Sequence, residues 1–115
     1  MTGTRPELER LLDDVAAALT TPASAIERTT AGGAVSWRAG EVTFAILGPT
    51  GVELRLDPRI AAAAARTPDT APSPRGKDWV RFNPQRIDPH AVDRLEAWFG
   101  LAVRRALEAP GRPRG

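Results

Sequence analysis

The sequence predicts an α+β fold: an antiparallel meander sheet of about four to five strands, two longer helices on one face, and a short alanine-rich helix. Three observations predict it. Apolar residues recur at helical spacing near both ends of the chain. Between them, short runs alternate apolar and polar residues, as strands with one buried face do. The turns between these runs are too short for crossovers, so neighbouring strands pair antiparallel.

The first predicted helix lies near the N-terminus. Thr4 and Glu7 have the spacing of a capping box, and Pro22 marks the end of the helical pattern. Apolar residues then follow one face: Leu8, Leu11, Leu12, Val15 and Leu19. We expect this stripe to pack in the core rather than to bind a partner.

Three alternating strands are expected between residues 34 and 56, after a weaker candidate at 25–30 whose pairing the sequence leaves open. The sequence Gly-Pro-Thr-Gly at 48–51 predicts a four-residue hairpin loop. Alternation predicts which side chains face the core: Val35, Trp37, Val42, Phe44, Ile46, Val52, Leu54 and Leu56. The polar residues between them would face solvent.

A short helix and a proline-rich connection follow. Asp57 and Pro58 form a helix start, and five consecutive alanines lie within residues 60–66. Prolines at 68, 72 and 74 then stiffen the connection to a fourth strand at 79–82. We interpret this connection as a structural connector that also forms the rim of a surface groove. The alternative is a dedicated binding loop.

The last helix has the clearest signals. Asp88 is its predicted N-cap, Pro89 takes the first helical position, and Pro110 ends it. The helix carries a wide apolar stripe: Val92, Leu95, Trp98, Phe99, Ala102, Val103, Ala106 and Leu107. Residues 1–109 are therefore predicted as a single α+β domain, and residues 110–115 as a flexible basic tail.

Composition limits the possible partners. The net charge is +2, but two arginines lie in the tail, and the remaining 14 cations balance 14 anions. A neutral body argues against a strong, uniformly electrostatic interaction with nucleic acid. We find no apolar run long enough for a secretory signal or a membrane span, and no cysteine. The expected location is the cytoplasm, with no membrane partner.

Little in the sequence indicates catalysis. His90 is the single histidine and has no serine in a nucleophile motif beside it; the alternative that we favour is a solvated histidine near a helix cap. One histidine without cysteine excludes the usual zinc sites. Gly32 and Gly33 precede a strand rather than the helix that a phosphate loop requires. We expect a non-enzymatic protein without cofactor or metal.

The predicted outer face of the sheet is the candidate binding surface. It carries arginines around one tryptophan, an arrangement that can stack on a base or hold a phosphate. The predicted contacts, with two cations from the end of the connection, are Arg38, Arg55, Arg75, Lys77, Trp79 and Arg81. The alternative is cross-strand pairing of arginine with glutamate, and a tryptophan covered by an arginine.

The order of elements resembles the MmcQ/YjbR family. The likeness rests on GAVSWRAGEVTFAIL, GVELRLDPRIAAAA, SPRGKDWVRF and the final amphipathic helix, and it covers roughly residues 34–107. Gly76, Trp79 and Val80 are the most family-like positions. The resemblance implies a "double-wing" α+β fold and DNA binding. The chain departs from the family in its alanine-rich short helix and its near absence of lysine.

Two functions follow as expectations. The first is a binding module that holds nucleic acid on the Arg/Trp sheet face. The second is a protein–protein or homodimerisation module with no nucleic-acid role, which would use the sheet or the broad stripe of the last helix.

Overall fold

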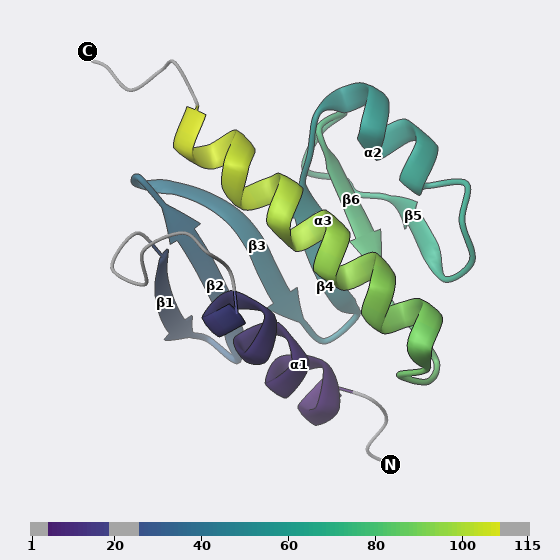
Figure 1. Cartoon of the computed structure of the whole chain (residues 1–115), viewed down its shortest axis with the longest axis horizontal. Helices are drawn as coiled ribbons and strands as arrows, with labels where there is room; N and C mark the ends of the chain where they lie inside the picture. Colours follow the sequence, from purple (N-terminus) through teal and green to yellow (C-terminus); the bar gives the residue numbers. More distant parts are fainter. Residues whose placement is uncertain (1–4, 19–25, 109–115) are drawn as a thin grey trace.

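The computed structural model describes residues 5–18 and 26–108. The helices are α1 (Arg5–Ala18), α2 (Pro58–Ala64) and α3 (Pro89–Glu108), and the strands are β1 (Ile26–Ala31), β2 (Ala34–Ala39), β3 (Val42–Gly48), β4 (Gly51–Arg55), β5 (Thr70–Pro72) and β6 (Trp79–Phe82) (Figure 1). The predicted cap Thr4, the helix position Leu19, the predicted stop Pro22 and the tail 110–115 lie outside the described residues.

The strands form one antiparallel sheet in the order β1-β2-β3-β4-β6-β5, which confirms the α+β prediction. The weak strand candidate does pair with the sheet, as β1. The sheet has six strands rather than four to five because part of the proline-rich connection forms β5, beside β6. β5 lies at the edge of the sheet, where Pro72 is tolerated because an edge strand can leave its outer backbone positions unpaired.

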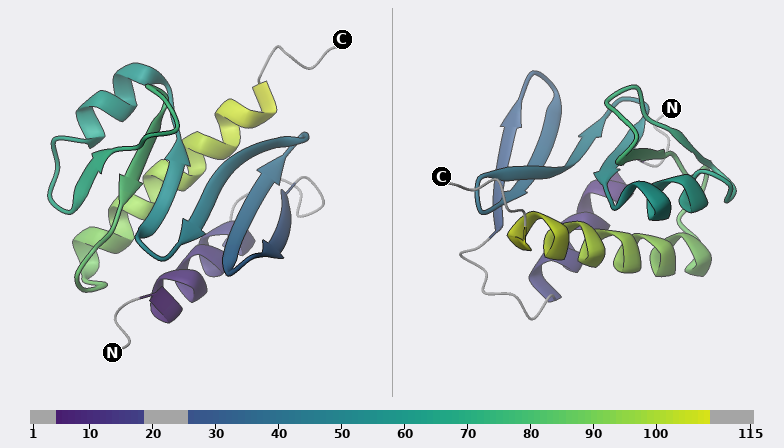
Figure 2. Two further views of the ribbon diagram at one scale, coloured as in Figure 1. Left: turned by 180° about the vertical axis from the view of Figure 1, so that it is seen from behind. Right: turned by 90° about the horizontal axis from the view of Figure 1, so that it is seen from above.

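The helices cover one face of this sheet, as predicted for the two long ones. α3 packs across β2, β3 and β4, and α1 packs beside α3. α2 lies against β5 and β6. The view from above in Figure 2 shows these helices on the same side of the sheet. Within the described ranges, no helix covers the opposite face, which we call the outer face.

Aromatic contacts attach α3 to the sheet. Phe99 is fully buried, with its ring centroid 6.1 Å from that of Trp37 and 5.1 Å from that of Phe44, both edge-to-face. A second such contact, with centroids 5.5 Å apart, joins Trp98 to Phe82 on β6. Edge-to-face pairs of aromatic rings stabilise a fold by more than the burial of their apolar surface alone. They fix α3 across the middle of the sheet.

A β-bulge in β3 overturns one prediction. The register shifts between Trp37, which pairs with Ala45, and Arg38, which pairs with Thr43, so Phe44 is an extra residue. Phe44 and Ala45 are consequently both fully buried. The prediction that Ile46 faces the core was wrong. Strict alternation assumed no bulge, whereas the shifted register places Ile46 on the outer face.

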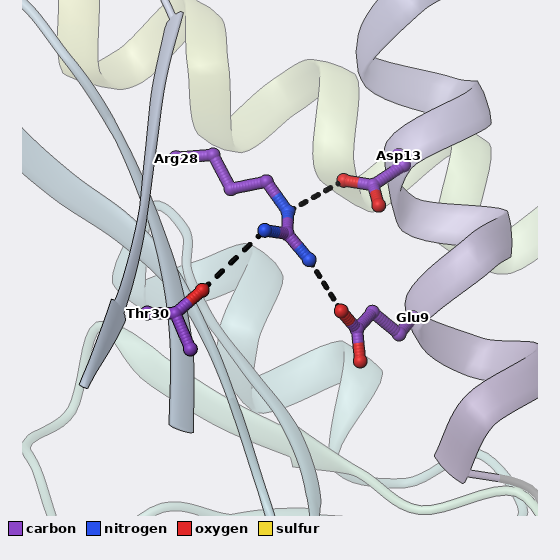
Figure 3. Close-up of polar contacts among 4 residues, drawn as sticks. All are labelled: Glu9, Asp13, Arg28 and Thr30. Atoms are coloured by element: carbon purple, nitrogen blue, oxygen red, sulfur yellow. Dashed lines mark hydrogen bonds and ion pairs between the residues drawn. The ribbon is translucent and has the colours of Figure 1, made fainter. Parts of the chain in front are cut away.

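Arg28 links α1 to the sheet edge (Figure 3). From β1 it donates a hydrogen bond to Asp13 at 3.0 Å and forms an ion pair with Glu9, both on α1. Its guanidinium also contacts Thr30 at 3.4 Å and lies 5.9 Å from the ring centroid of Trp37. Arg28 therefore joins β1, β2 and α1. Its contacts add to the burial of the apolar stripe of α1 in attaching this helix to the sheet.

The β3–β4 hairpin is tighter than predicted. Gly48 pairs directly with Gly51, which leaves a two-residue turn of Pro49 and Thr50 instead of a four-residue loop. Gly51 has a positive φ of 116°, a conformation that side chains rarely adopt. A Cβ there would also lie 2.5 Å from the carbonyl oxygen of Phe82 on the neighbouring strand. This position therefore requires glycine.

The two glycines of this turn provide a matched pair of substitutions. Gly51→Ala should lower the free energy of unfolding by about 2 kcal/mol or more, because strain and a backbone clash coincide. Gly48→Ala should change it little, because no atom lies within 4 Å of the added Cβ. Urea denaturation of both variants measures the difference. Equal effects at the two positions would contradict the described turn.

Candidate binding surface on the outer sheet face

Antiparallel pairing of β4 with β6 assembles the candidate surface. The register places Glu53 opposite Arg81 and Arg55 opposite Trp79. The end of the connection, which follows β5, adds Arg75 and Lys77. We call the group formed by Glu53, Arg75, Lys77, Trp79 and Arg81 the Trp79 surface. Because Leu54 and Val80 are buried on the helix side, their neighbours Glu53, Trp79 and Arg81 lie on the outer face.

Glu53 lies at the centre of the hydrogen bonds of this surface. Its carboxylate accepts hydrogen bonds from Ser73 Oγ at 2.5 Å and from Arg75 Nε at 2.7 Å. Ser73 is buried, and its hydroxyl also accepts from the backbone N–H of Arg75 at 3.1 Å. These bonds hold the proline-flanked segment against β4. They support the interpretation of the connection as a structural connector that borders the surface.

Arg75 covers Trp79. Its guanidinium carbon lies 5.6 Å from the centroid of the indole ring, within the range of a cation–π contact. Trp79 is half-buried and Arg75 is exposed, so the stack is open to solvent. Because Glu53 holds the same guanidinium from another direction, Arg75 is positioned over the ring rather than free to rotate.

The environment of Glu53 keeps it ionised. Burial by itself would raise the pKa of its carboxyl, but hydrogen bonds from Ser73 and Arg75 and the charges of Arg75 and Arg81 outweigh this effect. The pKa of Glu53 is therefore lowered from its ordinary value of 4.5. A carboxylate with a lowered pKa is a weak base, so it is poorly suited to activate Ser73 as a nucleophile.

The structure brings together only some of the six predicted contacts. Arg75, Trp79 and Arg81 gather around Glu53, and Lys77 extends from the same segment. Arg38 lies on β2, two strands from β4, where it forms an exposed ion pair with Glu27 of β1 at 2.8 Å. It is therefore separate from the Trp79 surface.

Arg55 has a different environment from the one that alternation suggested. Its Nε donates to Asp78 at 2.9 Å, and it lines a pocket with residues of α2 and α3. Sequence reasoning placed Arg55 simply on the outer face. The anchoring role of Ser73 was missed, although a serine between two prolines, close in sequence to Arg75, is a signal for a held turn.

The Trp79 surface carries a surplus of positive charge. Its charged residues are three cations, Arg75, Lys77 and Arg81, and one carboxylate, Glu53, and neither Lys77 nor Arg81 forms an ion pair within 4.0 Å in the described part of the chain. This local surplus arises although the body of the protein is neutral. Among the described residues, it is the one place on the outer face where cations lie beside an aromatic ring.

His90 and the carboxylates of the described residues form neither a catalytic centre nor a metal site together. His90 is exposed in the first turn of α3 and borders a surface pocket with Asp93 and Thr67. Over residues 5–18 and 26–108, no group of three or more histidine, cysteine, aspartate or glutamate side chains could hold a metal ion. In the same ranges, no helix is both long and apolar enough to cross a membrane.

Comparisons with family models, with curated proteins and with solved structures give no match for this chain. The resemblance to the MmcQ/YjbR family therefore stays a prediction.

The lowered pKa of Glu53 predicts a pH-dependent stability. The ionised carboxylate stabilises the fold at pH values above 4.5, and this contribution is lost as the pH falls through the lowered pKa. Glu53→Gln should therefore cost about 1–2 kcal/mol at neutral pH, and the difference from the wild type should shrink in acid. Urea denaturation at several pH values measures it.

Glu27→Gln provides the control, because Glu27 forms an ion pair of the same kind with 61% of its side chain exposed. Its effect should be small at every pH. A Glu53→Gln penalty that is the same at acid and neutral pH would show that the charge of Glu53 is not what stabilises this surface.

Proposed function

We propose that this protein is a non-enzymatic binding module that holds single-stranded nucleic acid on the Trp79 surface. One observation carries the proposal: an open Arg75–Trp79 stack shares its surface with two cations that form no ion pair with any described residue, on a sheet face that no described helix covers. The resemblance to a family for which DNA binding is proposed favours the same class of ligand.

The physical basis is a combination of stacking and charge. A base can stack on the indole of Trp79, with Arg75 moving to its other side or to a phosphate. Lys77 and Arg81 can then contact the flanking phosphates. Glu53 offsets part of this positive charge, so the expected affinity is moderate and sensitive to salt. Single strands suit the surface because their bases are unpaired and accessible.

A protein partner, or a second copy of the chain, is the second candidate. The rest of the outer face favours it, because Arg38 and Glu27 neutralise each other there, and Ile46 lies half-buried between strands on that face. Mixed charge around an apolar residue suits a protein surface better than a polyanion. Light scattering over a range of concentrations tests self-association.

The nucleic-acid proposal is tested by titrating mixed-sequence single-stranded DNA and RNA at two salt concentrations while tryptophan fluorescence is recorded. Trp37 and Trp98 are buried, so quenching reports mainly on Trp79. Arg75→Ala/Arg81→Ala should weaken binding and make its salt dependence shallower by about 1.4 in log–log slope, since each phosphate contact of a single strand contributes about 0.7.

Arg10→Ala/Arg66→Ala is the matched control, because it removes the same charge from exposed positions on α1 and just after α2. It should leave the slope unchanged. Trp79→Phe should remove most of the quenching and assign the signal. Equal slopes of the salt dependence for both double variants, or no binding at low salt, would contradict nucleic-acid binding at the Trp79 surface. Either result would favour a protein partner.

A further inference from the structure

A pocket on the helix side carries an inference that does not depend on the proposed function. After the pair Ala45–Leu54, β4 has no further partner on β3, and β3 bends away from it (Figure 1). A pocket of about 310 Å³ lies between the end of β4, the start of α2 and the last turns of α3. This volume is at the lower end of the range for small-ligand sites.

Arg105 is the distinctive group in this pocket. Its side chain is 33% exposed, yet its Nε is buried without a hydrogen-bond partner among the described residues. Its one ion pair is a long contact of 3.8 Å between Nη2 and Asp78. A guanidinium carries five donors, and a buried donor without a partner is costly. An acceptor in the pocket therefore meets Arg105 through the exposed part of its side chain, which lines the pocket, and not through the buried Nε.

Two further guanidinium groups line the same pocket. Arg55 is already engaged with Asp78 at 2.9 Å. Arg104 is exposed and forms no ion pair within 4.0 Å in the described part of the chain. Arg104 and Arg105, adjacent on α3, are thus the groups available to an anion.

Two carboxylates on the rim limit the charge of that anion. Asp57 is held as the N-cap of α2, where it accepts from the backbone N–H of Arg59 at 2.9 Å. Glu108 lines the opposite end of the pocket. Their negative charges disfavour a ligand with two or more charges, such as phosphate at neutral pH. A singly charged group meets less repulsion.

The pocket also has an apolar wall. Ile60 from α2 and Leu101 from α3 are half-buried and line it together. A ligand that placed only a charged group here would leave this wall in contact with water. An apolar body of a few carbon atoms would cover it and gain the free energy of burying that surface.

We propose that this pocket binds a small monocarboxylate with an apolar body, such as an aromatic or short-chain aliphatic acid. The carboxylate lies against the guanidinium groups of Arg104 and Arg105, where planar paired donors match its geometry. The apolar body lies against Ile60 and Leu101. This is a ligand site separate from the Trp79 surface, although the two are neighbours: Arg55 of the pocket pairs with Trp79 in the sheet, and Asp78 pairs with Arg55 and Arg105.

The test is an NMR titration of the full chain labelled with ¹⁵N, using benzoate as the probe. Saturable shifts are expected for the backbone amides of Leu101 and Arg105 and for Arg105 Nε–Hε. Benzyl alcohol, which has a similar shape and no charge, and inorganic phosphate should both bind at least about tenfold more weakly than benzoate.

Three single substitutions locate the site. Arg105→Gln should weaken benzoate binding by about tenfold or more, because the guanidinium and its paired N–H donors are lost. Arg104→Gln, at an exposed position that the fold does not need, should weaken it several-fold and keeps the test valid if Arg105→Gln fails to fold. Arg66→Gln, an exposed arginine that does not line the pocket, should leave the affinity unchanged.

Several outcomes would overturn the proposal. These are equal benzoate affinity in wild type and the Arg104 variant, equal affinity for benzoate and benzyl alcohol, tighter binding of phosphate than of benzoate, or no saturable shift at millimolar benzoate. Because Lys77, Trp79 and Arg81 are intact in these variants, oligonucleotide binding tests the other proposal separately.

Discussion

The position of Phe99 between Trp37 and Phe44 is the constraint on which the rest of the structure depends. Phe44 faces the core as alternation predicts, and the bulge in β3 adds Ala45 to the buried side next to it. The same bulge accompanies the bend that takes β3 away from β4, and α3 lies across the divergence. The bulge, the bend and the contacts of Phe99 thus lie close together under α3. Among the described elements, no helix covers the outer face.

Charged side chains form a network over the outer face, whereas helices cover the opposite face of the sheet. Glu53 organises it, since it anchors Ser73 and positions Arg75 over Trp79. Such a network protects the indole and still leaves it accessible, because an exposed arginine moves more readily than a packed helix. The two proposed sites approach each other at Asp78, whose carboxylate pairs with one arginine from β4 and one from α3.

Local signals in the sequence predicted most of the fold. The features that were not predicted depend on contacts between residues far apart in the sequence. Asp57 and Asp88 do cap α2 and α3 through hydrogen bonds to backbone N–H groups two and three residues ahead, an interaction fixed by short spacing. The bulge at Phe44 could not be predicted, because it depends on the register with β2. For the same reason Arg38 was grouped with residues two strands away. Arg105 was not considered for a site at all, since its pocket exists only once α2 and α3 are placed together.

The proposed function requires that the uncovered sheet face, rather than the helix layer, contacts the macromolecular partner. Backbone amide shifts of the labelled protein, recorded while a mixed-sequence single-stranded oligonucleotide is added at low salt, distinguish the two faces. We expect the shifts to concentrate on β4, β6 and residues 73–78, and the amides of α1 and the first half of α3 to stay in place. Shifts confined to the helices, with β4 and β6 unchanged, would contradict it.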